Sequence, residues 1–315
     1  MTMQECARVG STSLDNLNLN LSTNHHQLHL LDLLGEELRH RTLALFVGAG
    51  VSKDAGLPLW NELVAPLRDS LGSPCTEDAP DVAQRYVDAH GRLALLKYLE
   101  VTLSRVQDPG RMHAVLADLP ASVVVTTNYD QLMERALAQR QGAPVVIARD
   151  SDLDDAFRGA SIERHGRPVV VKLHGCLSAP DTIVLTRDDY VGYAEQHQRM
   201  IDCLHQLLAT QTFLFVGFSL TDPNFREIHR STRIGQGQPA ARSYLLDAVS
   251  RPSSEIAEWR AHGVETLLFH DFDEKLAFIR RLARRTRTVP APVVHGEARS
   301  PFRFNQAWLP TINLR

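Results

Sequence analysis

Polar residues follow four mainly apolar segments of this chain, each at the point where its segment ends. The segments and the residues after them are 43–47 with Gly48-Ala49-Gly50, 123–127 with Asn128 and Asp130, 169–173 with His174, and 213–216 with Gly217 and Ser219. These residue types suit a ligand that carries phosphate and sugar groups. Glycines let backbone N–H groups approach a phosphate closely. An asparagine offers a donor and an acceptor to hydroxyls or water, and a histidine of near-neutral pKa can accept a proton.

The glycine turn directly follows the unbroken apolar run Leu43–Val47, which is typical of a strand buried on both faces of a parallel sheet. Ser52 is expected to cap the helix that comes next, and a helix N-terminus attracts phosphate. Lys53 stands at the third glycine position of the dinucleotide fingerprint, and the turn carries no Walker sequence. Alone, the turn is equally compatible with a tight connection that binds no ligand.

Strands and helices must alternate to bring these residues together. Apolar runs predict strands at 43–47, 123–127, 144–148, 169–173, 213–216, 242–247 and 264–270, and helical spacing predicts helices between them. This alternation indicates an α/β fold with a Rossmann-like, doubly wound and mostly parallel sheet. Ligands of such sheets bind outside the carboxyl ends of the strands, so all four polar segments would reach one edge. A turn, a helix cap or a structural histidine explains each segment singly, but not their joint placement.

Changes of composition divide the chain into three parts. Residues 1–35 are an N-terminal extension that leads into a predicted helix at 26–40, and 36–289 form the main domain. Leucines at helical spacing predict a helical insertion at about 60–120, which would form a lid or small lobe. Residues 290–315 are a C-terminal tail with Phe302, Phe304 and Trp308 after a proline-containing break. The tail is expected either to pack on its own domain or to dock on another chain.

Charge and cysteine content narrow the classes of partner. Lysine and arginine number 34 against 37 aspartates and glutamates, a net charge of -3, which gives no general attraction to nucleic acid or membrane. Arginines recur between 280 and 287, a pattern that favours a solvated helix face. The four cysteines form no C-x-x-C pair, which predicts neither zinc nor a disulfide framework. With no signal peptide and no membrane-length apolar stretch, we expect a cytoplasmic protein.

Five motifs, read in order, resemble those of the sirtuin-like NAD-binding domains, and the similarity is greatest to the bacterial branch found in antiphage defence. The motifs are GAGVSKDAGLP from Gly48, TTNYD from Thr126, KLHG from Lys172, IVLTRDDY from Ile183 and VGFSLTDPNF from Val216. The resemblance covers roughly residues 40–275. It implies that NAD⁺ is bound by Gly48, Ala49, Gly50 and Ser52 at the diphosphate, Asn128 and Asp130 at the nicotinamide ribose, His174 as catalytic histidine, and Gly217, Ser219 and Asp247 on the adenosine side.

Two departures from the protein-deacylating sirtuins bear on the reaction. Those enzymes carry a zinc module of paired cysteines, and they have an Asp and an Arg where this chain reads Leu59-Trp60-Asn61. Both differences argue against an acetyl-lysine substrate and for hydrolysis of NAD⁺ to nicotinamide and ADP-ribose. The resemblance further implies depletion of NAD⁺ in abortive infection. Such an activity needs control, so we expect a homo-oligomer or an activating partner protein.

Three other functions remain open at this point. The same site could serve an ADP-ribosyltransferase or deacylase that uses a macromolecular acceptor. It could also belong to a non-catalytic module that binds NAD⁺ or ADP-ribose and reports it to a partner. Finally, Ser219 follows a strand as in a nucleophile elbow, with Asp247 and His270 in the chain order of an α/β hydrolase. That hydrolase would leave Asn128 and His174 without a role.

Overall fold

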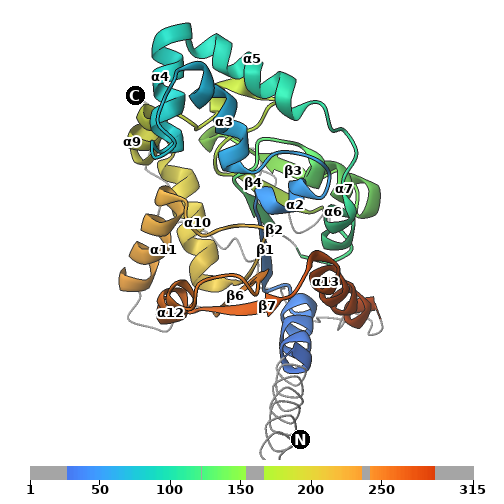
Figure 1. Cartoon of the computed structure of the whole chain (residues 1–315). Coiled ribbons are helices and arrows are strands. Elements are labelled where there is room, and N and C mark those ends of the chain that lie inside the picture. Colours follow the sequence, from blue (N-terminus) through green and yellow to red (C-terminus); the bar gives the residue numbers. More distant parts are fainter. Residues whose placement is uncertain (1–26, 122, 154–166, 236–241, 288–315) are drawn as a thin grey trace, which may run out of the picture.

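The computed structural model describes residues 27–121, 123–153, 167–235 and 242–287, and its centre is a seven-stranded parallel sheet (Figure 1). The strands are β1 (Leu43–Val47), β2 (Val123–Thr126), β3 (Val145–Ile147), β4 (Val169–Lys172), β5 (Thr212–Val216), β6 (Ser243–Ala248) and β7 (Val264–Phe269). Their order in the sheet is β3-β4-β2-β1-β5-β6-β7. The predicted Rossmann-like, doubly wound α/β fold is confirmed, and every strand pair is parallel.

The strand order reverses between β1 and β5, so the crevice between these two strands is the topological switch point where such sheets bind ligands. Val47, the last residue of β1, pairs with Thr126 of β2 and with Val216 of β5. Thr126 in turn pairs with Lys172 of β4. Four strands therefore end at the same level, and the polar segments that follow them start from one edge of the sheet.

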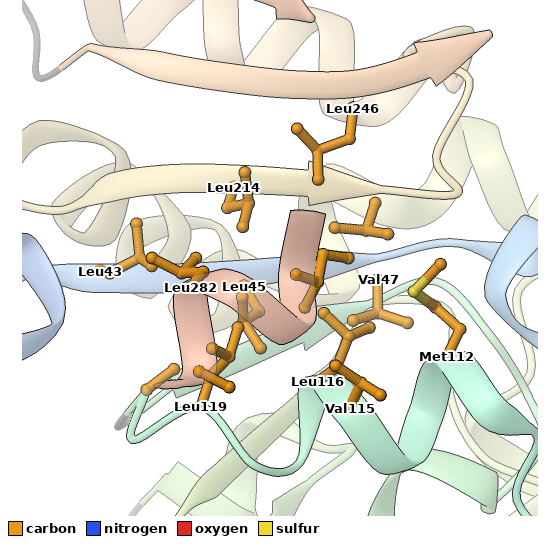
Figure 2. Close-up of a cluster of buried hydrophobic side chains, with 14 of the residues drawn as sticks. Leu43, Leu45, Val47, Met112, Val115, Leu116, Leu119, Leu214, Leu246 and Leu282 are labelled. Carbon is orange, nitrogen blue, oxygen red and sulfur yellow. The ribbon is translucent and has the colours of Figure 1, made fainter. Parts of the chain in front are cut away.

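Helices cover both faces of the sheet, which is why the strands read as continuous apolar runs. On one face, Leu43, Leu45 and Val47 of β1 pack with α6 (Arg111–Leu116) and α13 (Phe272–Arg287) (Figure 2). A helix over residues 27–39 joins the same apolar cluster. On the other face, the alternate β1 residues Ala44 and Phe46 pack with α10 (Gln198–Thr210), α11 (Pro223–Gly235) and α12 (Ser253–Ala261). Both faces of β1 are thus fully excluded from solvent.

The predicted helical insertion between β1 and β2 contains α3 (Trp60–Ser70), α4 (Ala79–His90), α5 (Arg92–Leu103) and α6. The first three share a separate apolar core, together with Leu57, Tyr129, Leu132, Ile183 and Leu185. They gather at one end of the sheet, whereas α6 lies against the sheet itself (Figure 1). The apolar core of the insertion therefore contacts two other segments, one just after β2 and one just before α9 (Arg187–Gln196).

Several sequence predictions fall outside the described residues. They concern residues 1–26, the tail that holds Phe302, Phe304 and Trp308, and the side chain of Arg287. The described residues also include α2 (Ala49–Lys53), α7 (Leu132–Arg140) and a 3-10 turn at Pro180–Thr182. The division into an extension, a main domain and a tail stays a prediction.

Candidate active site

The glycine turn after β1 lies directly against the turn after β5. A Cβ atom on Gly48 would come within 2.3 Å of the Gly217 carbonyl oxygen, and one on Gly50 within 2.9 Å of the Gly217 Cα. Gly217 itself has a φ of 65°, and a Cβ there would lie 2.5 Å from the Val51 nitrogen. Only glycine fits these three positions, because backbone meets backbone without room for a side chain.

This contact already uses two of the N–H groups of the turn. The Gly48 N–H donates to the Val216 carbonyl at 3.0 Å, and the Gly50 N–H donates to the Gly217 carbonyl at 2.9 Å. These two hydrogen bonds join the glycine turn to the end of β5 and to the turn that follows it. Ala49, which is half-buried, lies between these two donors.

Ser52 does not cap a helix, contrary to the expectation from the sequence. The helix α2 begins at Ala49, with Gly48 as its N-cap, so Ser52 lies inside the helix and is 2% exposed. Its hydroxyl points instead to the segment after β2. It donates to the Asp130 Oδ2 at 2.9 Å and accepts from the Asn128 Nδ2 at 3.1 Å. The glycine-turn segment and the Asn128–Asp130 segment are thus joined at their functional side chains.

His113 is a fourth member of this cluster, and it was not predicted from the sequence. It lies on α6, is fully buried, and places Nε2 3.4 Å from the Ser52 Oγ. The Gly110 N–H donates to its Nδ1 at 3.2 Å, so the proton of the neutral ring belongs on Nε2, facing Ser52. Burial lowers the pKa of His113, although the charges of Asp130 and Asp54 act in the opposite direction. The ring is therefore neutral at pH 7.

Asp130 has a partner on each carboxylate oxygen. Oδ2 accepts from Ser52, and Oδ1 accepts from the Leu132 N–H at 3.0 Å, at the start of α7. Its backbone carbonyl accepts from the buried ammonium of Lys172, which also donates to the Glu134 Oε1 at 2.7 Å. Burial acts to lower the pKa of Lys172, but nearby negative charges, above all Glu134, leave it raised. Asp130 is consequently held rigidly at the end of β2.

His174 stands at the end of β4 in a box of acidic and aromatic side chains. It is 3% exposed, and its Nε2 lies 3.4 Å from the Asp222 Oδ2. The edges of Tyr190 and Tyr193 face its ring, with centroid distances of 5.4 and 6.1 Å. Burial lowers the pKa of His174, and the charge of Asp222 offsets only part of that effect. The imidazole is therefore neutral at pH 7 and can act as a base.

Backbone pairing places Asn128 and His174 at neighbouring strand ends. Thr126 and Lys172 are register partners, and each functional residue comes two positions later. The Leu173 N–H donates to the Thr126 carbonyl at 2.9 Å, which continues the pairing past β4. The Thr126 hydroxyl donates to the Val47 carbonyl at 2.7 Å and accepts from the Asn128 N–H at 3.0 Å. Thr126 therefore fixes the Asn128 backbone against β1.

On the other side of the switch point, Arg251 connects Asp247 and Ser219, which the family resemblance places on the adenosine side. Its guanidinium pairs with the Asp247 carboxylate and donates to the Ser219 carbonyl at 3.0 Å. The Ser219 hydroxyl is exposed and shares a hydrogen bond with the Thr221 hydroxyl at 2.7 Å. Leu220 between them is buried with a φ of 62°, a strained conformation that suits functional loops.

The α/β hydrolase alternative does not fit this arrangement. Asp247 accepts from the Ala248 N–H and from Arg251, and Ser219 pairs with Thr221. Within the described ranges, no Ser–His–Asp contact joins these residues to His270.

Metal ions and membranes are two further classes of partner. In the described part of the chain, no group of three or more His, Cys, Asp or Glu side chains is placed to hold a metal ion. Over the same residues, no helix has the length and apolarity needed to span a bilayer.

The arginines near the end of α13 lie mainly on its solvent-facing side. The side chains of Arg280, Arg281 and Arg284 are exposed, while Arg285 pairs with Asp32.

Comparison with known proteins connects this geometry to a family. A model of the SIR2-like domain matches residues 122–267. The NAD(+) hydrolase ThsA of Acinetobacter baumannii (strain 532279) is 34% identical over 225 residues, which cover 70% of this chain and 45% of that protein. The NAD(+) hydrolase ThsA of Bacillus cereus (strain MSX-D12) is 28% identical over 274 residues, with 80% and 56% covered.

A further relative extends the comparison beyond the hydrolases named ThsA. Defense-associated sirtuin 2 of Bacillus subtilis is 27% identical over 198 residues, which cover 60% of this chain and 19% of that protein. The chain spans about half the length of the two ThsA proteins that it matches. The resemblance that the five motifs carry is confirmed, and the chain contains a SIR2-like domain.

Proposed function

We propose that this chain is an NAD⁺ glycohydrolase, which cleaves NAD⁺ to nicotinamide and ADP-ribose. The observation that carries the proposal is the placement of Asn128 and His174 at adjacent strand ends, beside the glycine turn at the switch point of the sheet. Relatives that bear the name NAD(+) hydrolase support the same reaction. The neutral state of the buried His174 suits a general base at pH 7.

The contacts divide the proposed binding residues into two groups. Gly48, Ala49 and Gly50 would lie along the diphosphate, and Gly217, Ser219 and Asp247 on the adenosine side. Ser52 and Asp130 would act on NAD⁺ through Asn128, because their side-chain oxygens already bind one another and the start of α7. In this arrangement, Asn128 presents its amide to the nicotinamide ribose while Ser52 holds the amide in place.

The reaction is a hydrolysis of an N-glycosidic bond. The bond from ribose C1′ to the nicotinamide nitrogen breaks, and its electron pair leaves with nicotinamide, which departs neutral. The ribose develops oxocarbenium character. A water oxygen then bonds to C1′, and its proton passes to His174. Asn128 orients the water or the ribose hydroxyls. The products are nicotinamide, ADP-ribose and one proton.

The direct test compares Asn128→Ala and His174→Ala with the wild-type chain by chromatographic measurement of nicotinamide release. Each substitution should lower turnover at least ~10²-fold, the usual scale for a positioned base or polar group. His40→Ala is the matched control, because His40 is solvent-exposed on the opposite end of β1. Binding of NAD⁺ and the melting temperature should change far less than turnover. Near-normal cleavage by a folded His174→Ala protein would contradict the mechanism.

The same assay separates the other two uses of an NAD⁺ site. An ADP-ribosyltransferase would transfer the ADP-ribosyl group to a macromolecule, whereas a deacylase would move the acetyl group from a peptide to ADP-ribose. Mass spectrometry detects both outcomes when acetylated peptide and NAD⁺ are supplied together. A non-catalytic module would bind NAD⁺ or ADP-ribose with no nicotinamide release under any activating condition. Release of nicotinamide with free ADP-ribose in equal amount identifies the hydrolase.

We also propose that the activity depletes NAD⁺ in a cytoplasmic defence response and that it is gated. An uncontrolled NAD⁺ hydrolase harms its own cell, so a homo-oligomer or a partner protein must switch it on. Assays of the chain alone and with the products of neighbouring genes, combined with light scattering, test this. Deletion of the residues after Pro292 should weaken assembly more than folding. An assembly that is unchanged by the deletion would exclude the tail from this role.

A further inference from the structure

His174 contacts Asp222, which lies on the connection between β5 and α11. Its Oδ2 lies 3.4 Å from the His174 Nε2 and accepts from the Tyr190 hydroxyl at 3.1 Å. Its Oδ1 accepts from the Phe225 N–H at 2.8 Å, as a cap at the start of α11. The side chains of Asp222 and His174 are 10% and 4% exposed. Asp222 is therefore a nearly buried carboxylate whose two oxygens have different partners.

The cap alone does not account for an aspartate at this position. Asparagine caps a helix as well as aspartate does, and it brings no charge into a dry site. The second oxygen faces Tyr190 and His174, two groups that can each donate a hydrogen bond. Burial raises the pKa of Tyr190 far above its usual range, so its hydroxyl remains a donor. Oδ2 thus lies between two hydrogen-bond donors, a place that suits a carboxylate oxygen, which only accepts.

We propose that Asp222 is the positioning residue of His174, held in place by Tyr190, in the NAD⁺ hydrolysis put forward above, on which this inference rests. The carboxylate accepts the Nε2–H of His174 and so fixes the neutral tautomer with a lone pair on Nδ1. When water attacks C1′, its proton bonds to that nitrogen and the ring becomes an imidazolium. The ionised Asp222 stabilises this cation and itself takes up no proton.

The substitution Asp222→Asn separates this role from the helix cap. The amide oxygen can still accept from the Phe225 N–H, while the charge beside His174 is lost. We expect kcat to fall at least about tenfold, below the loss for removal of the base itself, with little change in KM for NAD⁺. Asp271→Asn is the matched control: the Asp271 Oδ1 accepts from the Glu274 N–H at 2.8 Å at the start of α13, and Asp271 follows β7, the edge strand farthest from β4.

The pH profile supplies a readout that a merely structural role would leave unchanged. Four titratable groups face His174: Asp222, Tyr190, Tyr193 and His197. Both tyrosines have pKa values raised out of the working range, mainly by burial. Because the charge of Asp222 raises the pKa of His174, its removal should move the acid limb of kcat/KM to lower pH. The pKa of His197 is also lowered, so His197 could give rise to the same acid limb. An unchanged limb in a His197→Gln variant assigns the limb to His174.

A measurement without turnover keeps this inference distinct from the proposed function. The imidazole signals of His174, assigned with a His174→Asn variant, give its pKa by NMR titration in the wild type and in Asp222→Asn. A lower pKa in the variant supports the pairing even if the wild-type chain hydrolyses no NAD⁺, which would overturn only the proposed function. An unchanged His174 pKa, or wild-type kcat with an unmoved acid limb, overturns the inference. If Asp222→Asn unfolds, Tyr190→Phe provides the milder test, with a smaller loss in the same direction.

Discussion

Replacing Gly48 by alanine would put a methyl group where the turn after β5 already lies. The new Cβ would fall 2.3 Å from the Gly217 carbonyl oxygen and 2.6 Å from the Phe218 Cα, well inside van der Waals contact. Those atoms are backbone, and they cannot withdraw without breaking the hydrogen bond from Gly50 to Gly217 or the pairing of Val47 with Val216. Overpacking of this kind costs about 1–3 kcal/mol. We expect the upper end of that range, because no flexible side chain can yield.

A destabilisation of about 3 kcal/mol should lower the melting temperature by roughly 6–12 °C in a domain of this size class. Gly35→Ala is the matched control. Gly35 lies within the helix over residues 27–39, and its nearest new neighbour would be the Arg285 Cβ at 3.9 Å, an ordinary contact. Alanine in a helix interior stabilises by about 0.5–1 kcal/mol relative to glycine. Thermal and urea unfolding monitored by circular dichroism measure both changes. A Gly48→Ala protein as stable as the wild type would refute the close contact between the two turns.

Three further predictions concern burial, pH and metal. Glu134→Ala should cost about 3–5 kcal/mol in urea unfolding, because it leaves the buried ammonium of Lys172 without its carboxylate; the double change with Lys172→Met should cost less. The pKa values of His113 and His174 are both lowered by burial, so the unfolded chain binds protons more readily; stability should therefore fall as pH drops below about 6.5, where free histidine titrates, and melting curves at several pH values check the sign. Elemental analysis should find less than one zinc per chain, and stoichiometric zinc would reopen the deacylase reading.

The fold was largely predictable because its strands are buried on both faces. Runs such as Leu43–Val47 and Val169–Leu173 carry no alternation, and a glycine or a polar residue marks the end of each. The strand boundaries found by pattern differ from those of the structure by at most one residue at each end, which is within the usual uncertainty of element ends. What the pattern did not contain was the strand order, which depends on how distant segments pair.

The site was predictable where one residue type follows one strand, and unpredictable where two segments meet. Asn128 and His174 could be located from their strands alone. Ser52 was expected as a cap because the start of α2 cannot be seen in the sequence; the helix begins directly at the turn and carries Ser52 inward. His113 reaches the site because α6 packs near α2, where it contacts Ser52. Arg251 reaches the site because it follows β6 and binds the Ser219 carbonyl. Neither residue forms a local motif.

The order of the strands makes the crevice a late product of protein synthesis. β1 leaves the ribosome early, but its neighbour β5 is made only after β2, β3 and β4, and Leu43 must wait for Thr212 before the two can pair. Until then the Gly48–Gly50 turn has no opposing Gly217, and His174 has no Asp222. At about 5–20 residues per second, synthesis from Leu43 to Thr212 takes roughly 8–34 s. A nascent or prematurely terminated chain thus carries the first residues of the proposed site without the crevice that would unite them.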